Sequence, residues 1–307
     1  MAEIILKALE GSNSLAYLAA IGTLRVATLA WPEKNVRLSW KNLDGGWRPC
    51  IHNCIDMDVD VWLAGLYSVL NSGINEPAFT ISDDLNLSCL DFRVNALDAQ
   101  NKAQPTDRNY ADFIAAFGSE SVELLKNGKK SGLMTDTALR TMSGAGNQHF
   151  LEFLRELTKV TNVKNISDSL FIGWSYSDTG LSLRWDPADD RRYALRWLRP
   201  STDPVKTERG ANRLAIEALP LLPSMPCRGR LETTGFTQRK RQNVSWTWPI
   251  WTSALNIDVV RSLLAMPELQ RISPNRTTLY AMSIEEIYRS ERITQGKFRN
   301  FTMAVSV

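Results

Sequence analysis

Histidine and cysteine are scarce in this chain of 307 residues, and their scarcity limits the chemistry that the sequence can offer. There are two histidines and four cysteines. Cys50, His52 and Cys54 lie within five residues, but a structural zinc site needs a fourth ligand, and no second cluster of this kind supplies one. Neither His52 nor His149 stands in a recognisable arrangement with a serine or cysteine. The sequence therefore argues for free thiols and against a bound metal or a triad enzyme.

Long apolar runs and phosphate-binding loops are also missing. The most hydrophobic stretch, residues 15–31, is interrupted by Arg25 and followed by Pro32, so it favours a buried helix over a membrane span. The first residues lack the basic and then apolar pattern of a secretion signal. The Gly-x-Ser-x-Gly and Walker A patterns are absent. We therefore expect a cytoplasmic protein without a membrane contact or a cofactor, and the sequence favours a binding protein over an enzyme.

Positive charge is concentrated in the second half of the chain. The formal net charge is +3, from 36 Lys+Arg and 33 Asp+Glu. Residues 181–307 hold 20 of the basic and 12 of the acidic residues, and 17 of those 20 are arginine. Arginine suits bidentate contacts with phosphate and stacks on planar groups. This asymmetry indicates a polyanionic partner, although a basic face can also serve an acidic protein.

The basic residues of this half form three clusters that are interleaved with aromatic residues. Phosphate charge dominates the affinity for nucleic acid, and aromatic rings offer stacking platforms. A solvated basic face without a ligand is the alternative for any one cluster. The candidate nucleic-acid contacts are Arg191, Arg192, Arg196, Arg199, Arg228, Arg230, Arg239, Lys240, Arg241, Arg292, Lys297 and Arg299.

A glycine-rich turn, SGAGN at residues 143–147, is the best candidate for an anion site in the first half. It precedes a predicted helix, whose first backbone amides could hold a phosphate. An ordinary turn at the start of a helix is the alternative. Asn147 and Gln148 are therefore added to the candidate contacts, with Arg140 upstream of them.

An acidic cluster lies at the start of the basic half. Asp186, Asp189 and Asp190 could bind a divalent cation, as carboxylates do in metal-dependent nucleases. Arg191 and Arg192 follow directly and offer these carboxylates salt-bridge partners. We therefore expect a turn with internal ion pairs, and we keep a nuclease as an alternative.

Hydrophobic periodicity predicts an α+β fold of helices and mostly antiparallel strands in two lobes. The predicted lobes are a mainly helical one at 1–160 and a basic α+β one at 161–307. The ten tryptophans are expected mainly in the core. The predicted helices are 14–30, 59–70, 109–125, 147–160, 211–222, 257–264 and 284–288. The predicted strands are 36–40, 78–81, 181–185, 228–236, 244–248 and 298–307, and residues 95–108 are predicted as a loop.

Five segments, in this order, resemble a known family. They are SLAYLAAIGTLR at 14–25, LRTMSGAGNQ at 139–148, WDP at 185–187 with DRRYA at 190–194, GANRLA at 210–215 with EALP at 217–220, and TTGF at 233–236. The chain is similar to the Csb-type subunits of type I-G (formerly I-U) CRISPR–Cas systems, which belong to the Cascade effector assembly.

The resemblance implies a non-catalytic subunit, comparable in role to the Cascade large subunit. Such a subunit contacts the crRNA and the target DNA, packs against other Cascade subunits, and works with a helicase-nuclease that cuts. The resemblance supplies no functional residues, so the candidate contacts rest on the charge argument alone. Besides the metal-dependent nuclease, a protein-only scaffold whose basic half docks an acidic partner remains open.

Overall fold

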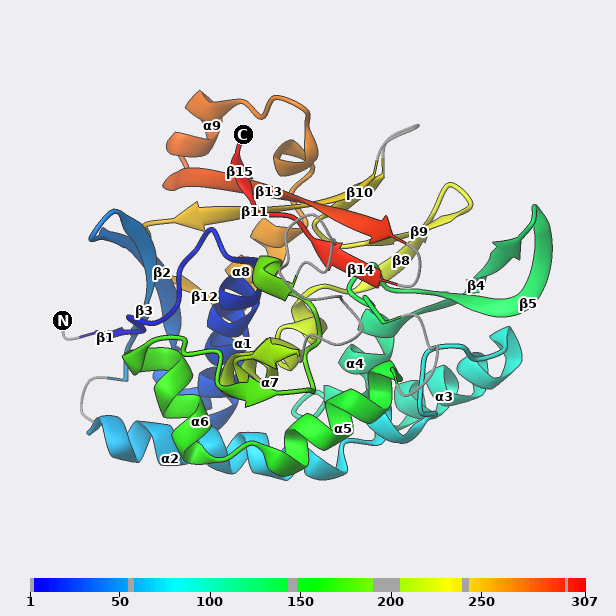
Figure 1. Ribbon diagram of the computed structural model, residues 1–307, viewed down its shortest axis with the longest axis horizontal. Coiled ribbons are helices and arrows are strands. Elements are labelled where there is room, and N and C mark those ends of the chain that lie inside the picture. The colour runs from blue at the N-terminus through cyan, green and yellow to red at the C-terminus, as the bar shows by residue number, and fades with distance from the viewer. Residues whose placement is uncertain (1–2, 55–57, 143–147, 190–204, 239–242, 296–297) are drawn as a thin grey trace.

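The structure is a computed structural model, which describes residues 3–54, 58–142, 148–189, 205–238, 243–295 and 298–307. The structure combines many helices with antiparallel sheets, so the predicted α+β class is confirmed (Figure 1). The helices are α1 (Ser14–Ala30), α2 (Val59–Ser72), α3 (Cys89–Lys102), α4 (Asn109–Phe117), α5 (Phe150–Val160), α6 (Val163–Ser167), α7 (Arg209–Ile216), α8 (Ile257–Leu264) and α9 (Arg276–Tyr280).

The strands of the described residues form two larger sheets and three separate two-stranded pairs. A four-stranded sheet has the order β1-β3-β2-β12, and a five-stranded sheet has the order β10-β11-β13-β14, with β15 also paired to β13. These pairs are the β4–β5 and β8–β9 hairpins and the pair β6–β7, whose strands are far apart in the sequence. The strands are β1 (Ile4–Ile5), β2 (Arg37–Leu43), β3 (Gly46–His52), β4 (Gly118–Lys126), β5 (Lys129–Asp136), β6 (Asp178–Thr179), β7 (Lys206–Thr207), β8 (Ser224–Cys227), β9 (Arg230–Thr233), β10 (Phe236–Gln238), β11 (Val244–Trp251), β12 (Leu255–Asn256), β13 (Ile284–Gln295), β14 (Phe298–Phe301) and β15 (Val305–Ser306).

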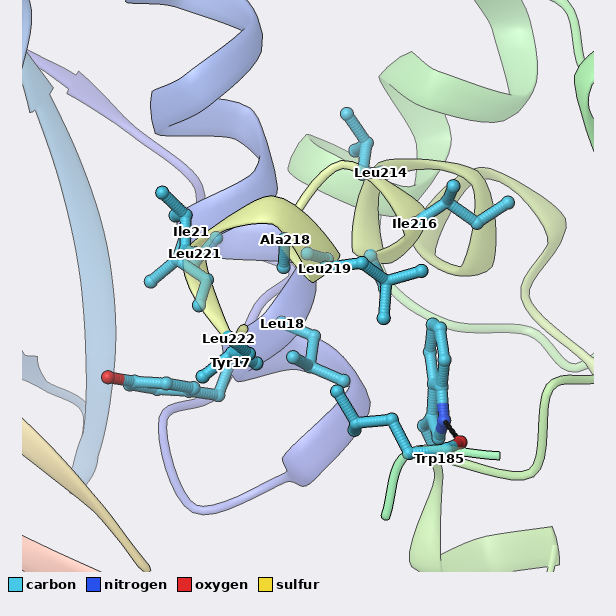
Figure 2. Packing of buried hydrophobic residues seen from close by; sticks show 14 of the residues in the cluster. Tyr17, Leu18, Ile21, Trp185, Leu214, Ile216, Ala218, Leu219, Leu221 and Leu222 are labelled. Atoms are coloured by element: carbon cyan, nitrogen blue, oxygen red, sulfur yellow. Dashed lines mark hydrogen bonds between the residues drawn. The ribbon is translucent and has the colours of Figure 1, made fainter. Parts of the chain in front are cut away.

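Helix α1 is the central helix and begins and ends where its sequence predicts. The side chain of Asn13 caps it by accepting a hydrogen bond from the amide of Ala16 at 3.1 Å. Nearly all of its side chains are buried, and α7 packs against it closely. Gly22 makes this approach possible, because a Cβ atom there would lie 1.9 Å from the carbonyl oxygen of Leu214. Figure 2 shows Leu18 and Ile21 of α1 among the leucines that follow α7.

An aromatic cluster joins α1 to both sheets. The ring of Tyr17 stacks on Trp40 of β2 at 5.6 Å and contacts Trp246, Trp248 and Trp251 of β11. The indole of Trp251 donates to the carbonyl oxygen of Leu38 at 2.8 Å. The expectation that most tryptophans serve the core is therefore confirmed, since the largest fully buried side chains include Trp40, Trp62, Trp185, Trp246, Trp248 and Trp251.

Several predicted elements are wrong, and tertiary contacts explain the largest errors. The helix expected at 109–125 ends at Phe117, because Gly118 has φ +155° and a Cβ there would lie 2.4 Å from the carbonyl oxygen of Thr135. Residues 284–288, expected as a helix, begin the twelve-residue strand β13, which pairs with β11. Residues 78–81 lie largely in a 3₁₀ helix, residues 95–102 belong to α3, and residues 181–185 form no strand.

Contacts in the core cross the expected lobe boundary at residue 160. Strand β12 pairs with β2, and buried apolar residues from before and after the boundary form one hydrophobic cluster. The division into two lobes stays a prediction. Within the described parts of the chain, no helix combines the length and the apolar character that crossing a membrane requires.

Candidate nucleic-acid interface

Two neighbouring hairpins project from the same side of the molecule. Strand β4 packs against both β8 and β9, and Figure 1 shows the β4–β5 and β8–β9 hairpins extending together away from the sheets. Each is closed by a two-residue turn with positive φ at both positions: Asn127-Gly128 at +52° and +75°, and Arg228-Gly229 at +48° and +77°. Such turns match the right-handed twist of the flanking strands, so each hairpin presents a short tip.

Cationic side chains occupy both tips, and we call this set the basic hairpin tips: Lys126, Lys129, Lys130, Arg228 and Arg230. All five residues are exposed. Lys130 lies 3.7 Å from a carboxylate oxygen of Glu123, and its side chain is 79% exposed. Within the described parts of the chain, the other four cations have no carboxylate partner. Their charge is therefore available to an anion.

Sequence reasoning found only part of this set. Arg228 and Arg230 are among the predicted contacts, whereas residues 126–132 are predicted only as a flexible basic turn after the helix expected at 109–125, with no role in binding. The pattern that could have shown them is Lys-Asn-Gly-Lys-Lys at 126–130, since Asn-Gly is the strongest short signal for a hairpin turn. Because a helix is predicted up to residue 125, no strand is expected before this turn, and the hairpin is therefore not predicted.

Arg292 and Arg299 form a second group of candidate contacts, on the five-stranded sheet. Arg292 of β13 lies opposite Phe301, and Thr294 lies opposite Arg299, so the two arginines share one face of the sheet. The guanidinium of Arg292 donates to the carbonyl oxygen of Arg140 at 3.2 Å. Burial, followed by the nearby charges of Arg299 and Arg140, lowers the pKa of Arg292 to about 10, and Asp136 opposes this shift.

The charge of Arg292 is thus poorly compensated. Within the described residues, no carboxylate forms an ion pair with it, and its Nε has no hydrogen-bond partner. A half-buried cation in this state gains from any anion that reaches it.

Arg140, upstream of the glycine-rich turn, is paired with two carboxylates, and the turn itself, residues 143–147, lies outside the described residues, so the anion site expected there stays a prediction. Its guanidinium bonds the carboxylate of Asp84 at 2.5 Å and also that of Asp136. Asp84 further accepts a hydrogen bond from the amide of Phe150, the first residue of α5, at 3.2 Å. The carboxylate of Asp84 therefore joins Arg140 to the first amide of α5. Gln148 lies half-buried just before this helix.

The candidate contacts between residues 191 and 199 all lie outside the described residues. Nine candidate contacts lie outside the described residues, and for them the sequence argument stands as it was. These are Asn147, Arg191, Arg192, Arg196, Arg199, Arg239, Lys240, Arg241 and Lys297.

The acidic cluster is held by protein donors. Asp186 is 2% exposed, and its carboxylate accepts hydrogen bonds from Asn13 at 3.0 Å, from the amide of Ala188 at 2.9 Å and from the hydroxyl of Tyr176 at 3.0 Å. Burial raises its pKa, and these hydrogen bonds act against that rise. Asp189 accepts from the hydroxyl of Ser182, and Asp190 lies outside the described residues. Over the described ranges, no three His, Cys, Asp or Glu residues are grouped as metal ligands.

One histidine does lie in a triad-like arrangement, contrary to the expectation from sequence. On the adjacent strands β2 and β3, the hydroxyl of Ser39 lies 2.8 Å from Nε2 of His52, and Nδ1 of His52 lies 3.8 Å from a carboxylate oxygen of Glu3. Ser39 is only 2% exposed, so its hydroxyl is closed to a substrate. Burial lowers the pKa of His52, and Lys41 also pairs with Glu3. Ser39, His52, Glu3 and Lys41 therefore form a network of polar contacts between neighbouring strands. All four cysteines are free thiols.

The five segments that carry the family resemblance meet in one core. The hydroxyl of Ser14 bonds the carbonyl oxygen of Trp185 at 2.5 Å, and the indole of Trp185 donates to the carbonyl oxygen of Leu139 at 2.8 Å. Thr233 accepts from the amide of Ala138 at 2.9 Å, and the segment at 210–215 lies in α7 against α1. Many residues of these segments are therefore explained by packing.

Comparison with models of known protein families finds no match, and comparison with curated proteins finds none. The function must be argued from the charge and the geometry of this chain.

Proposed function

We propose that this protein is a non-catalytic, nucleic-acid-contacting subunit of a CRISPR interference complex in the cytoplasm. In this role it binds crRNA and target DNA, packs against other Cascade subunits, and leaves cutting to a helicase-nuclease. The family resemblance in the sequence supplies the particular complex. The observation that carries the general role is the pair of adjacent hairpins whose exposed tips hold five cations.

Geometry supports a contact with phosphates at the basic hairpin tips. A projecting hairpin can reach into or along a groove that a flat surface cannot enter. Lysine and arginine side chains without carboxylate partners release counterions from nucleic acid without first breaking an ion pair. Arg292 and Arg299 add positive charge on the five-stranded sheet, where the poorly compensated charge of Arg292 favours an anion.

The test is the salt dependence of binding to a crRNA-like single strand and to a DNA duplex. The test variant carries Lys126→Gln, Lys129→Gln, Arg228→Gln and Arg230→Gln. Each lost phosphate contact should reduce the log–log salt slope by about 0.7 to 0.9. We expect a slope smaller by about 2 to 4 and a clear loss of affinity at low salt.

A matched control removes four exposed cations that have carboxylate partners one helical turn away. It carries Lys102→Gln, Arg108→Gln, Lys159→Gln and Lys164→Gln, so it has the same net charge. We expect a much smaller change of slope. Equal loss in both variants would mean that net charge alone drives binding, and an unchanged slope in the hairpin variant would reject this surface.

Further observations distinguish the proposed subunit from the scaffold and the nuclease. Purification together with the products of neighbouring genes should retain crRNA, and those genes should include a CRISPR array and a helicase-nuclease. Binding only to an acidic protein would support the scaffold. Mg²⁺-dependent cleavage by the purified chain, lost when Asp186, Asp189 and Asp190 become Asn, would support the nuclease.

A further inference from the structure

A cavity of about 290 Å³ lies beside the start of α1. The residues that line it include none of the candidate nucleic-acid contacts described above. Its walls come from residues 8–16, from the chain between α6 and Pro187, and from Met303 after β14. We call it the α1 pocket. Its surface is more apolar than polar, and none of the described residues that line it is a lysine or arginine. Such a pocket suits a flat, largely uncharged group better than a phosphate.

Two aromatic side chains form a rigid corner of the α1 pocket. The rings of Trp174 and Tyr176 meet edge to face, with centroids 6.1 Å apart and planes at 83°. The indole of Trp174 donates to the carbonyl oxygen of Ser169 at 3.2 Å, and the hydroxyl of Tyr176 donates to Asp186 at 3.0 Å. Both rings are thus held in place before any ligand arrives, which lowers the entropy cost of stacking on them.

The backbone of Tyr176 adopts an energetically unfavourable conformation. Its φ is +52°, a left-handed conformation that is costly for an aromatic residue. The amide of Tyr176 donates to the carboxylate of Glu208, so the surrounding structure stabilises this conformation. Costly backbone conformations of this kind concentrate at binding sites.

Glu10 brings one negative charge to the α1 pocket. Its carboxylate accepts hydrogen bonds from the amide of Ser12 at 2.9 Å, from the hydroxyl of Ser12, and from the amide of Trp47 at 3.3 Å. These donors are neutral, and no described lysine or arginine forms an ion pair with it. Oε1 accepts from Trp47 and has room for one further donor, whereas Oε2 already accepts two hydrogen bonds from Ser12. A ligand that presents two parallel N–H groups would bond Oε1 directly and would replace the hydroxyl of Ser12 on Oε2, because that hydroxyl can rotate away.

We propose that the α1 pocket binds one unpaired nucleobase, preferably guanine, stacked on Trp174 with its amino and imino edge on the carboxylate of Glu10. The inference rests on the proposed function in taking its ligand from nucleic acid. Single-stranded bases are commonly read by stacking on aromatic side chains and by hydrogen bonds to the Watson–Crick edge. The basic hairpin tips would hold phosphates, whereas this pocket would hold a base.

Guanine is preferred because of the donor pattern on its edge. Its N1–H and N2–H₂ groups lie side by side and match the two oxygens of a carboxylate. Adenine and cytosine place an acceptor nitrogen beside their amino group, and uracil flanks its single N–H with two carbonyl oxygens. In those bases an acceptor would face Glu10, which costs free energy in a partly buried site.

The test uses free nucleosides, which carry no phosphate and do not need the hairpins. Isothermal titration calorimetry of the full chain should detect guanosine and give at least about a tenfold weaker affinity for adenosine, cytidine and uridine. Trp174→Ala should weaken guanosine binding about tenfold or more, and Trp174→Phe should retain most of it. Glu10→Gln should remove the preference for guanosine, whereas the exposed control Glu33→Gln should not.

Three outcomes would overturn the proposal: equal binding of all four nucleosides, binding that survives Trp174→Ala in a variant that melts like the wild type, or binding of acetyl-arginine amide in place of guanosine. The last would assign the α1 pocket to a protein side chain. The hairpin variant should bind guanosine as tightly as the wild type does. A failure in this pocket therefore leaves the salt-dependence test of the proposed function intact.

Discussion

Arginines in this protein fall into two groups according to their partners. Arg25 and Arg213 are buried, and both bond the carboxylate of Glu217, with a distance of 2.8 Å from Arg213. Within the described residues, by contrast, the hydrogen-bond acceptor of Arg292 is a backbone carbonyl, and no carboxylate pairs with it. A buried cation with a carboxylate serves the structure, whereas one without a carboxylate is a candidate for binding an anion.

Replacing Glu217 with Gln should unfold the protein more easily. Breaking a buried ion pair costs roughly 3–5 kcal/mol, because the partner charge stays buried and unpaired. Urea unfolding at pH 7 measures the loss. The exposed control Glu33→Gln should change the free energy of unfolding by less than about 0.5 kcal/mol. A loss as small as that of the control would contradict the structural role of Glu217.

The same residue predicts a dependence on pH. Burial alone would raise the pKa of Glu217, but Arg213 and Arg25 outweigh it, and the pKa is lowered. A carboxyl with a lowered folded-state pKa stabilises the protein above its unfolded pKa of about 4.3 and loses this contribution as the pH falls through the folded value. The difference in stability between the wild type and Glu217→Gln should therefore shrink below about pH 4.

Replacing Arg292 with Met should separate stability from binding. Without nucleic acid, the free energy of unfolding should stay the same or rise by about 1 kcal/mol, because a poorly compensated buried charge is removed. Affinity for a single strand should fall about tenfold with the loss of one charge-assisted contact.

Arg276→Met is the matched control, since Arg276 pairs with Glu286 at 2.6 Å. It should lower stability and leave affinity unchanged. If Arg292→Met destabilises the protein without affecting binding, Arg292 is structural.

At the scale of elements, the β4–β5 hairpin stands apart from the rest of the fold. Its inner end packs against α3, β8 and β9, while residues 124–130 are all exposed. The outer half therefore contributes little to the core. Such a projecting hairpin is expected to serve a contact outside the chain.

Replacing residues 124–131 with Asn-Gly should shorten the hairpin without unfolding the protein. The free energy of unfolding should change by less than about 1 kcal/mol, because the removed residues are exposed apart from the half-buried Ser131, whose hydroxyl bonds Leu124 within the same segment. The salt slope of nucleic-acid binding should fall as three lysines are lost.

A full-length variant with Lys126→Gln, Lys129→Gln and Lys130→Gln separates charge from length. Equal binding defects in both variants would assign the effect to charge. Normal binding by the shortened variant would remove this hairpin from the interface.

At the scale of the whole molecule, the close contact of α1 with α7 links the beginning of the chain to its second half. Gly22→Ala would place a methyl group against the backbone of Leu214, so we expect a loss of at least about 1–3 kcal/mol in chemical unfolding. Leu29→Ala, at an exposed position of the same helix, should cost far less. Equal, small losses in both variants would show that the two helices can separate without harm.

Local signals were enough to predict several elements and part of the candidate site. Residues 14–30 follow a helix-capping residue and are mostly apolar, which favours a buried helix. Residues 257–264 have apolar side chains at helical spacing, and both helices were predicted correctly. The positions of Arg228 and Arg230 followed from counting charge. Short-range patterns succeed here because capping, periodicity and turn chemistry act over a few residues.

Other features of the protein depend on contacts between residues that are far apart in the sequence, and only the tertiary structure decided them. Residues 284–288 have apolar spacing that suits a helix, but pairing with β11 makes them a strand. The sequence alone does not distinguish the roles of Arg140 and Arg292, yet of these two arginines it is Arg140 that forms salt bridges with Asp84 and Asp136. Charge and composition by themselves determined that this protein has a basic half. The fold decided which cations are neutralised inside and which face an anion, because ion pairing depends on distances of a few ångströms between residues that the sequence places far apart.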